Sequence, residues 1–380
     1  MKSIKVLFGV AMLVIVASNL WSMLHWSERR GVIDDLCYLR QAHLFQEFGW
    51  RGIETDISSD TDGYFASMTR EAGHPEWNSA TAPICHTLMP ATGKRVIQYP
   101  PGTGFVLAAF PEGFQVAPLY ASATIMVLLV SLLAIGFAKR YSSTVLAGVF
   151  GCMALYFMIN PAKASYSVAP TMVICAVGGF LTAALFNSVG LRMKVVAAAL
   201  VGLLLGFSVA FRIPNLLFSA GYFAFFSGCF LLRRKFSLFV CGVVFGICYV
   251  IGLIPNFLAN AVNAGSPFAT TYSSVDVVAP SFTLTIFEQY LTDTQGLLLV
   301  VGIAWTICGL VWRKEGELRT AALVTGPNLI VSLTFFLSHP LYNPYYLLPI
   351  AMLSLWTLLF DHLCAQGMIP EAVRSQYENL

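Results

Sequence analysis

Charged residues are scarce in this chain. Only 11% of its 380 residues are Asp, Glu, Lys or Arg, whereas 57% are hydrophobic and the mean hydropathy is +0.73. Soluble domains carry about 25% charged residues, so this chain lacks the polar surface that water requires. The net charge of +3 is too small to indicate a nucleic-acid partner. The composition therefore predicts a polytopic membrane protein in contact with the lipid bilayer.

Polar interruptions are rare over ten long stretches of the sequence. Runs of roughly 17–25 apolar residues cross a bilayer as helices, because backbone amides have no water partner in the hydrocarbon. We therefore predict an all-α fold with about ten transmembrane helices, at 6–24, 119–138, 143–160, 168–186, 194–211, 215–232, 236–257, 296–312, 320–337 and 345–362. No linker or repeat divides residues 1–380, so a single membrane domain is expected, with two long loops at 25–118 and 258–295.

Lys and Arg are unevenly distributed between the connections. One set of short connections holds pairs or clusters of cations, whereas the other set holds only Lys163 and Arg212. Because cytoplasmic connections are enriched in Lys and Arg, both termini are expected in the cytoplasm. This topology places 14 of the 19 carboxylates outside. We therefore expect the chemistry of this protein on the periplasmic or extracytoplasmic side, most simply of a bacterial inner membrane.

Several familiar catalytic and metal-binding patterns are missing from the sequence. We find no GxxxxGK[ST], GxSxG, HExxH or CxxC pattern. The stretch DTDG at 60–63 resembles part of a calcium loop, but Thr69 stands where the closing Glu would be, and we discount it. The sequence leaves the metal content of the protein undetermined.

The first long loop begins with two adjacent acids, Asp34 and Asp35. Apolar residues at helical spacing follow them as far as Gly49, which predicts an interfacial helix over 34–48, and 282–292 is expected to form another. Acids in a first helical turn are favoured by the helix dipole, so one interpretation is a cap with a solvated neighbour. The other is a general base or metal ligand that faces a cavity at the membrane edge.

Cations and cysteines on the outer side each allow two interpretations. Arg212 and Lys163 either extend along the bilayer to reach water or bind an anionic headgroup. Cys37 and Cys85 are the two cysteines of the first loop, where an oxidising compartment could join them. The sequence does not decide whether they form a disulfide.

Five short motifs, in this order and on one face, carry a resemblance to a known family. They are DDLCY (34–38), GKRVIQYPPGTG (93–104), FRIPN (211–215), NAGSPFATTY (263–272) and HPLYNPYYLLP (339–349). Together they resemble the GT-C superfamily of membrane glycosyltransferases, in particular the branch that holds protein mannosyltransferases and the aminoarabinose transferases of lipid A.

The resemblance implies a glycosyltransferase with a polyprenyl-phosphate sugar donor. The sugar would pass, with inversion, to a hydroxyl of a glycan, glycolipid or protein acceptor at the outer face. Asp34 matches the first acid of the family motif D-[DE]-x-x-Y and is the expected general base, with Asp35 as a second catalytic, orienting or metal-binding acid. Arg212, Lys163 and Arg40 are the expected ligands of the donor phosphate. The expected substrate contacts are Gln98, Tyr99, Tyr272, His339 and Tyr342.

The sequence also departs from the family pattern. It is shorter than many relatives, lacks their soluble C-terminal domain and has no carboxylate in NPAKASYSVAP (160–170), which puts a bound Mg²⁺ or Mn²⁺ in doubt. The alternative function is a lipid or solute transporter that transfers no sugar. Transporters commonly carry polar groups at mid-membrane, and we find no acidic or basic residue deep in any predicted span, which argues against proton coupling.

Overall fold

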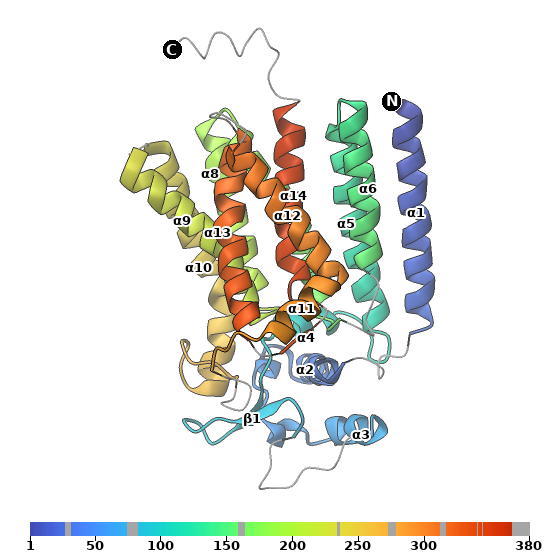
Figure 1. Cartoon of the computed structure of the whole chain (residues 1–380). Helices are drawn as coiled ribbons and strands as arrows, with labels where there is room; N and C mark the ends of the chain where they lie inside the picture. Colours follow the sequence, from blue (N-terminus) through green and yellow to red (C-terminus); the bar gives the residue numbers. More distant parts are fainter. Residues whose placement is uncertain are drawn as a thin grey trace.

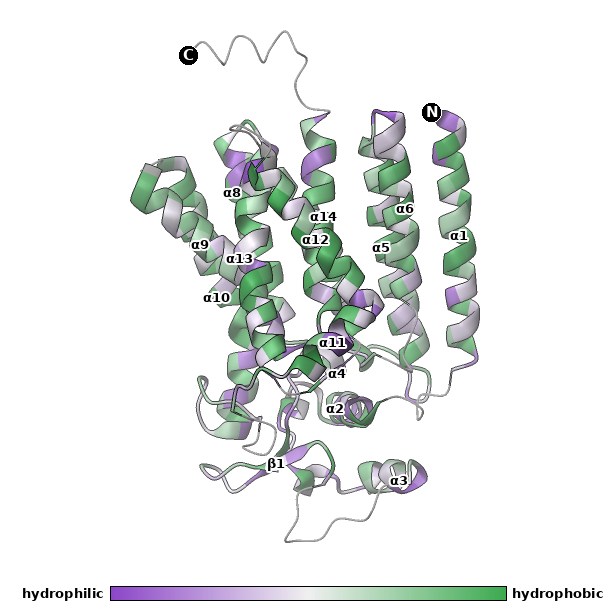
Figure 2. Ribbon diagram, viewed as in Figure 1, coloured by the Kyte–Doolittle hydropathy of each residue, from purple (hydrophilic) through white to green (hydrophobic). Residues whose placement is uncertain are grey.

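Helices form about 77% of the described part of the chain. A computed structural model describes residues 1–26, 32–73, 83–158, 164–233, 236–272, 279–311, 317–339, 341–343 and 345–366. Within these ranges nine helical segments are long and apolar enough to cross a membrane, and α6 is a shorter apolar helix (Figures 1 and 2). The chain is therefore an integral membrane protein. Every one of the ten predicted spans overlaps one of these helices.

The spanning helices differ from the predicted ranges mainly at their ends. Eight of them are α1 (Lys2–Leu24), α5 (Val116–Phe137), α7 (Val168–Asn187), α8 (Leu191–Ser208), α10 (Phe236–Ala264), α12 (Thr294–Val311), α13 (Glu317–Ser338) and α14 (Leu348–Ala365), and the shorter apolar helix α6 (Tyr141–Phe157) overlaps the prediction at 143–160. The remaining span, Ile213–Leu232, starts with the 3₁₀ segment η4 (Ile213–Ser219), continues as α9 (Ala220–Gly228) and ends in the π-helical turn η5 (Cys229–Arg233). Its change of helix type produces a short α9 beside the long α10 (Figure 1).

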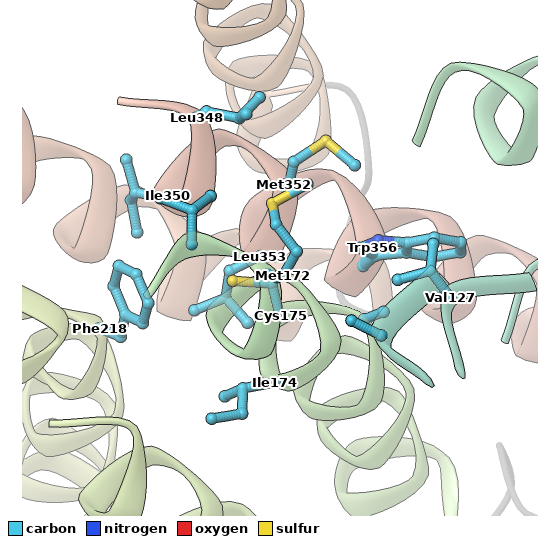
Figure 3. Packing of buried hydrophobic residues seen from close by; sticks show 14 of the residues in the cluster. Val127, Met172, Ile174, Cys175, Phe218, Leu348, Ile350, Met352, Leu353 and Trp356 are labelled. Atoms are coloured by element: carbon cyan, nitrogen blue, oxygen red, sulfur yellow. The ribbon is translucent and has the colours of Figure 1, made fainter. Parts of the chain in front are cut away.

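The interior of the bundle is built around α14. Of its spanning window 89% is buried, the largest share among the described spans. Figure 3 shows Met352, Leu353 and Trp356 of α14 beside Met172 and Cys175 of α7. Elsewhere α8 and α10 approach closely because Gly206 faces the carbonyl of Tyr249, where a Cβ would collide.

The first long loop folds against one end of the bundle, which we call the loop face. It contains α2 (Ile33–Phe48), η2 (Gly49–Ile53), η3 (Ile57–Ser59), α3 (Tyr64–Glu71), β1 (His86–Leu88), β2 (Arg95–Ile97) and α4 (Gly102–Leu107). The two strands pair antiparallel, with His86 opposite Ile97. Figure 1 shows these elements at the end of the bundle opposite to the start of α1, and α11 (Leu284–Thr292) lies at the same end.

The structure differs from the expectation for α2. We expected an amphipathic helix with one face in lipid, but every residue from Asp35 to Phe45 is buried. The helix packs against α3, α4 and η2 on the loop face, so protein covers it on several sides. Polar residues that would have faced water, such as Arg40 and His43, find partners in the loop instead.

One disulfide within the first loop and two hydrogen bonds to α10 hold this loop in place. Cys37 of α2 is joined to Cys85 by a disulfide, with 6.5 Å between their Cα atoms. At the end of α10, the amide of Asn263 accepts a hydrogen bond from the backbone N–H of Thr55 (2.9 Å) and donates one to the carbonyl of Ile53 (2.8 Å). The loop is thus a packed layer that holds the residues of the candidate site.

Candidate functional site

The acidic pair begins α2, and its two members have different surroundings. Asp34 is half-buried, and the hydroxyl of Tyr99 donates a hydrogen bond to its Oδ1 at 2.7 Å. Tyr99 is placed by the β1–β2 hairpin, since it lies two residues after β2 and the N–H of Gln98 bonds the carbonyl of Cys85 at 3.1 Å. The carboxylate of Asp34 is therefore oriented by a residue from a distant part of the loop.

Asp35 is fully buried and ties α2 to the segment before α7. Its Oδ2 accepts the N–H of Val32 at 3.0 Å, and its Oδ1 accepts the N–H of Tyr166 at 2.8 Å. Burial raises the pKa of Asp35 well above its ordinary value, the nearby charge of Asp34 adds to this rise, and the two backbone donors oppose it. These contacts describe a residue that positions its neighbour Asp34.

Arg212 lies between α8 and η4 and is also buried, with 7% of its surface exposed. Its guanidinium carbon stands over the rings of Tyr345 and Tyr346, at 5.1 and 5.7 Å from their centroids. Among the residues that the structure describes, no carboxylate lies within salt-bridge distance of this guanidinium, and it donates no hydrogen bond to them. Two aromatic faces thus hold a cation whose planar fork of donors suits an anionic ligand.

Two tyrosines connect Asp34 with Arg212. Burial raises the pKa of Tyr38, the charge of Asp34 raises it further, and the charge of Arg212 lowers it. The same three influences act on Tyr345: burial and the charge of Asp34 raise its pKa, the charge of Arg212 lowers it, and the pKa is raised overall. Both charges therefore act on both hydroxyls, and on this electrostatic basis we treat the acid and the cation as one cluster.

Aromatic contacts extend this cluster to the second long loop. The ring of Tyr99 lies 5.4 Å from that of Tyr38 and meets the ring of Tyr272 edge-on at 6.1 Å. The hydroxyl of Thr271 donates to the carbonyl of Gln98 at 2.8 Å, which joins the two loop segments. We use the name tyrosine cluster for Tyr38, Tyr99, Tyr272, Tyr345 and Tyr346.

Sequence reasoning missed three members of the tyrosine cluster as site residues. Tyr38 follows Asp34 by one helical turn within DDLCY, so the spacing that carries both to one face was visible in the sequence. Tyr345 and Tyr346 lie in HPLYNPYYLLP, where an aromatic belt explains them equally well. Their approach to Arg212 depends on the packing of α14 on α7 and of α7 on α8, which the sequence does not reveal.

Arg40 contacts a different part of the loop, and its role as a phosphate ligand stays a prediction. Its guanidinium donates to the carbonyls of Thr55 and Asp56, both at 2.8 Å, and bonds Nε2 of His86 at 2.7 Å. Burial lowers its pKa to about 10, and the charges of Asp60 and Asp56 offset part of the fall. These donors hold the loop together.

The other predicted residues do not all converge on Asp34. The hydroxyl of Tyr342 donates to Oδ2 of Asp293 at 2.9 Å, and His339 stacks on Phe335 with 6.0 Å between centroids. The side chain of Gln98 is buried, and its backbone supplies the contacts described above. Lys163 lies outside the described residues.

One group of described side chains has the spacing of a metal site, but it does not fit an ion. Cys37, Cys85 and His86 bring their ligand atoms within 4.8 Å of one another. The two sulfurs are joined to each other, and the ring nitrogens of His86 bond the carbonyl of Ile84 (2.7 Å) and the guanidinium of Arg40. In DTDG, Asp60 accepts the N–H of Phe65 at 2.8 Å, so this acid caps α3.

The arrangement offers a proton acceptor, Asp34, and a cation suited to anions, Arg212, each in contact with tyrosine side chains. A carboxylate can accept a proton from a bound hydroxyl, and a buried Arg can stabilise charge that gathers on a phosphate. Tyrosine rings with polar hydroxyls also suit ligands that have both apolar and hydroxyl-bearing surfaces. Comparison with protein-family models, curated proteins and solved structures finds no match to this chain.

Proposed function

We propose that this chain is a membrane glycosyltransferase that uses a polyprenyl-phosphate-linked sugar. The order of the five motifs supports the family, and the shared surroundings of Asp34 and Arg212 support the chemistry. The observation that carries the proposal is the buried residue Arg212, whose guanidinium stands over the rings of Tyr345 and Tyr346, together with the bond from Tyr99 to Asp34.

Arg212 is the reason for proposing a donor that carries a phosphate. Arg212 is 7% exposed as a residue and donates to no acceptor among the described residues, so its planar fork of donors is available to an anion. A phosphate at the head of a lipid reaches the membrane boundary while its chain stays in the hydrocarbon. Arg212 lies between two membrane-spanning segments, α8 and Ile213–Leu232, which is the level that such a headgroup occupies.

Asp34 is the reason for proposing an acceptor that reacts through a hydroxyl. Asp34 takes the proton of an acceptor hydroxyl, whose oxygen forms a bond to the anomeric carbon of the donor sugar. The bond from that carbon to the phosphate oxygen breaks, and polyprenyl phosphate leaves with an added negative charge that Arg212 stabilises. Because attack and departure take place on opposite faces of the carbon, the sugar is inverted.

The disulfide supports the proposed side of the membrane. Disulfides persist in oxidising compartments, so the Cys37–Cys85 bond favours a loop face on the periplasmic side of a bacterial inner membrane. The termini would then lie in the cytoplasm, as the distribution of Lys and Arg predicts. The sugar and the acceptor hydroxyl remain to be identified by experiment, and a Mg²⁺ or Mn²⁺ at the acidic pair stays a prediction.

The test is incubation of the purified protein with a panel of polyprenyl-phosphate sugars. We expect one donor to raise the thermal stability and to release free polyprenyl phosphate when a suitable acceptor is present. Asp34→Asn should lower release by roughly 10²–10⁴-fold while donor binding persists. Glu47→Gln, on the exposed side of the same helix, is the matched control and should leave release unchanged.

Two results would contradict the proposal that this protein is a glycosyltransferase. Full release by the Asp34→Asn variant would remove the proposed base. Stabilisation of the unaltered protein by a donor, with no release for any acceptor but with movement of the lipid between leaflets, would favour the transporter.

A further inference from the structure

Large aromatic side chains are exposed at one edge of the loop face. Phe48 at the end of α2 is 46% exposed, Trp50 in η2 is 79% exposed and Phe105 in α4 is 43% exposed. The rings of Trp50 and Phe105 stack with 5.3 Å between centroids, and Phe45 packs edge-on against Phe105 at 5.5 Å. We call Phe48, Trp50 and Phe105 the aromatic patch.

The backbone beneath the patch is firmly held. Gly49 precedes Trp50 with a φ of +56°, a conformation that glycine adopts readily and that turns the chain at the end of α2. Gly52 packs against the carbonyl of Leu44, where a Cβ would collide. The side chain of Gln46 donates to the carbonyls of Ala108 and Phe110, at 3.2 and 2.7 Å, and joins the end of α2 to the segment after α4. Trp50 is thus presented outward from an ordered turn.

The patch continues into the membrane-spanning surface. The N–H of Gly102, the first residue of α4, bonds the carbonyl of Ala210 at 2.7 Å, just beyond the last residue of α8. At its other end α4 leads to Phe114, which is 52% exposed and lies two residues before the spanning helix α5. Figure 1 shows α4 between α2 and the ends of the spanning helices. The exposed rings therefore lie at the level where the hydrocarbon ends.

We infer that the aromatic patch docks on the interfacial region of the bilayer, among the phospholipid headgroups and upper acyl chains. Trp residues favour this region because the ring is apolar and the indole N–H can reach a polar partner. The contact would hold the end of α2 against the lipid, while the buried stretch from Asp35 to Phe45 stays within protein. The inference does not depend on the transferase proposal, because it concerns a different surface.

The test uses the fluorescence of Trp50 in the full chain reconstituted into phosphatidylcholine nanodiscs. The difference between the unaltered protein and Trp50→Phe isolates the emission of this residue. We expect that emission to be lost when the acyl chains carry bromine near the glycerol and to be insensitive to iodide in the water. The same subtraction is made for two control residues. Trp21, 69% exposed on the spanning helix α1, is the positive control for quenching by brominated lipid. Trp356, 1% exposed, is the control for a tryptophan that protein shields from both quenchers.

A second variant examines the stacking. Phe105→Ala removes the ring beneath Trp50, so it should weaken the quenching by brominated lipid and move the Trp50 emission to longer wavelength. Quenching by iodide without quenching by brominated lipid would show that the patch faces water and would overturn the inference. Quenching by neither agent would show that protein covers the patch, either a second copy or another partner, and would overturn it as well.

Discussion

Replacement of Arg212 by Lys separates the two interpretations of this cation. The change keeps the positive charge but loses the planar fork of donors and the stacking between Tyr345 and Tyr346. A hydrogen bond to a charged group contributes about 1.5–3 kcal/mol, so losing one such bond to a phosphate weakens binding by roughly 10- to 150-fold. A residue that merely extends toward water would tolerate the same change.

The assay is the Kd of farnesyl phosphate, a short polyprenyl phosphate, measured by titration calorimetry on the purified protein. Arg192→Lys is the matched control, because Arg192 is exposed at the other end of α8 and should have no contact with the ligand. Thermal unfolding of both variants reports on folding separately from binding. An unchanged Kd for Arg212→Lys would refute the reasoning and would leave Arg212 as a residue that only extends along the bilayer.

Two further predictions concern the first loop. The Cys37–Cys85 bond closes a sequence separation of 48 residues, so the double substitution by Ser should lower the stability of the loop by about 4 kcal/mol on the chain-entropy relation. Dithiothreitol should produce the same change in the unaltered protein and none in the Ser variant, and equal stability of all forms would contradict the prediction. Burial and then the charge of Arg40 lower the pKa of His86 to about 3, so the unfolded chain binds an extra proton between about pH 6.5 and about pH 3. The free energy of unfolding should therefore fall on acidification through this range, by at most about 1.4 kcal/mol per pH unit. His86→Gln should flatten this pH profile, measured by thermal unfolding, whereas His339→Gln should not.

The membrane-spanning architecture was predictable from the sequence because lipid imposes a simple rule on the backbone. Each apolar run must form its hydrogen bonds internally, so nine of the ten predicted runs coincide with helical segments long enough to span, and the tenth, 143–160, overlaps the shorter helix α6. In the loop the helix at 34–48 was predictable from spacing, and Gly49 marks its end as expected. Its burial was not predictable, since the residues that cover it come from α3, α4 and η2 and depend on long-range packing.

The candidate site was likewise only partly predictable from the sequence. The position of Asp34 at a helix start and its adjacency to Asp35 follow from local sequence. The bond from Tyr99 to Asp34 depends on the hairpin that brings together residues 65 positions apart. Arg40 is close to the acids in sequence, but its guanidinium bonds Thr55, Asp56 and His86, contacts that the sequence did not reveal. Proximity along the chain did not predict proximity in the fold.

The attachment of Asp35 to the backbone N–H of Tyr166 has a mechanical consequence. Tyr166 stands two residues before α7, so a rigid strut runs from a spanning helix to the first turn of α2. We expect a tilt of α7 in the bilayer to be transmitted through this hydrogen bond to the first turn of α2, so the alignment of Asp34 with Tyr99 should respond to the thickness of the surrounding membrane.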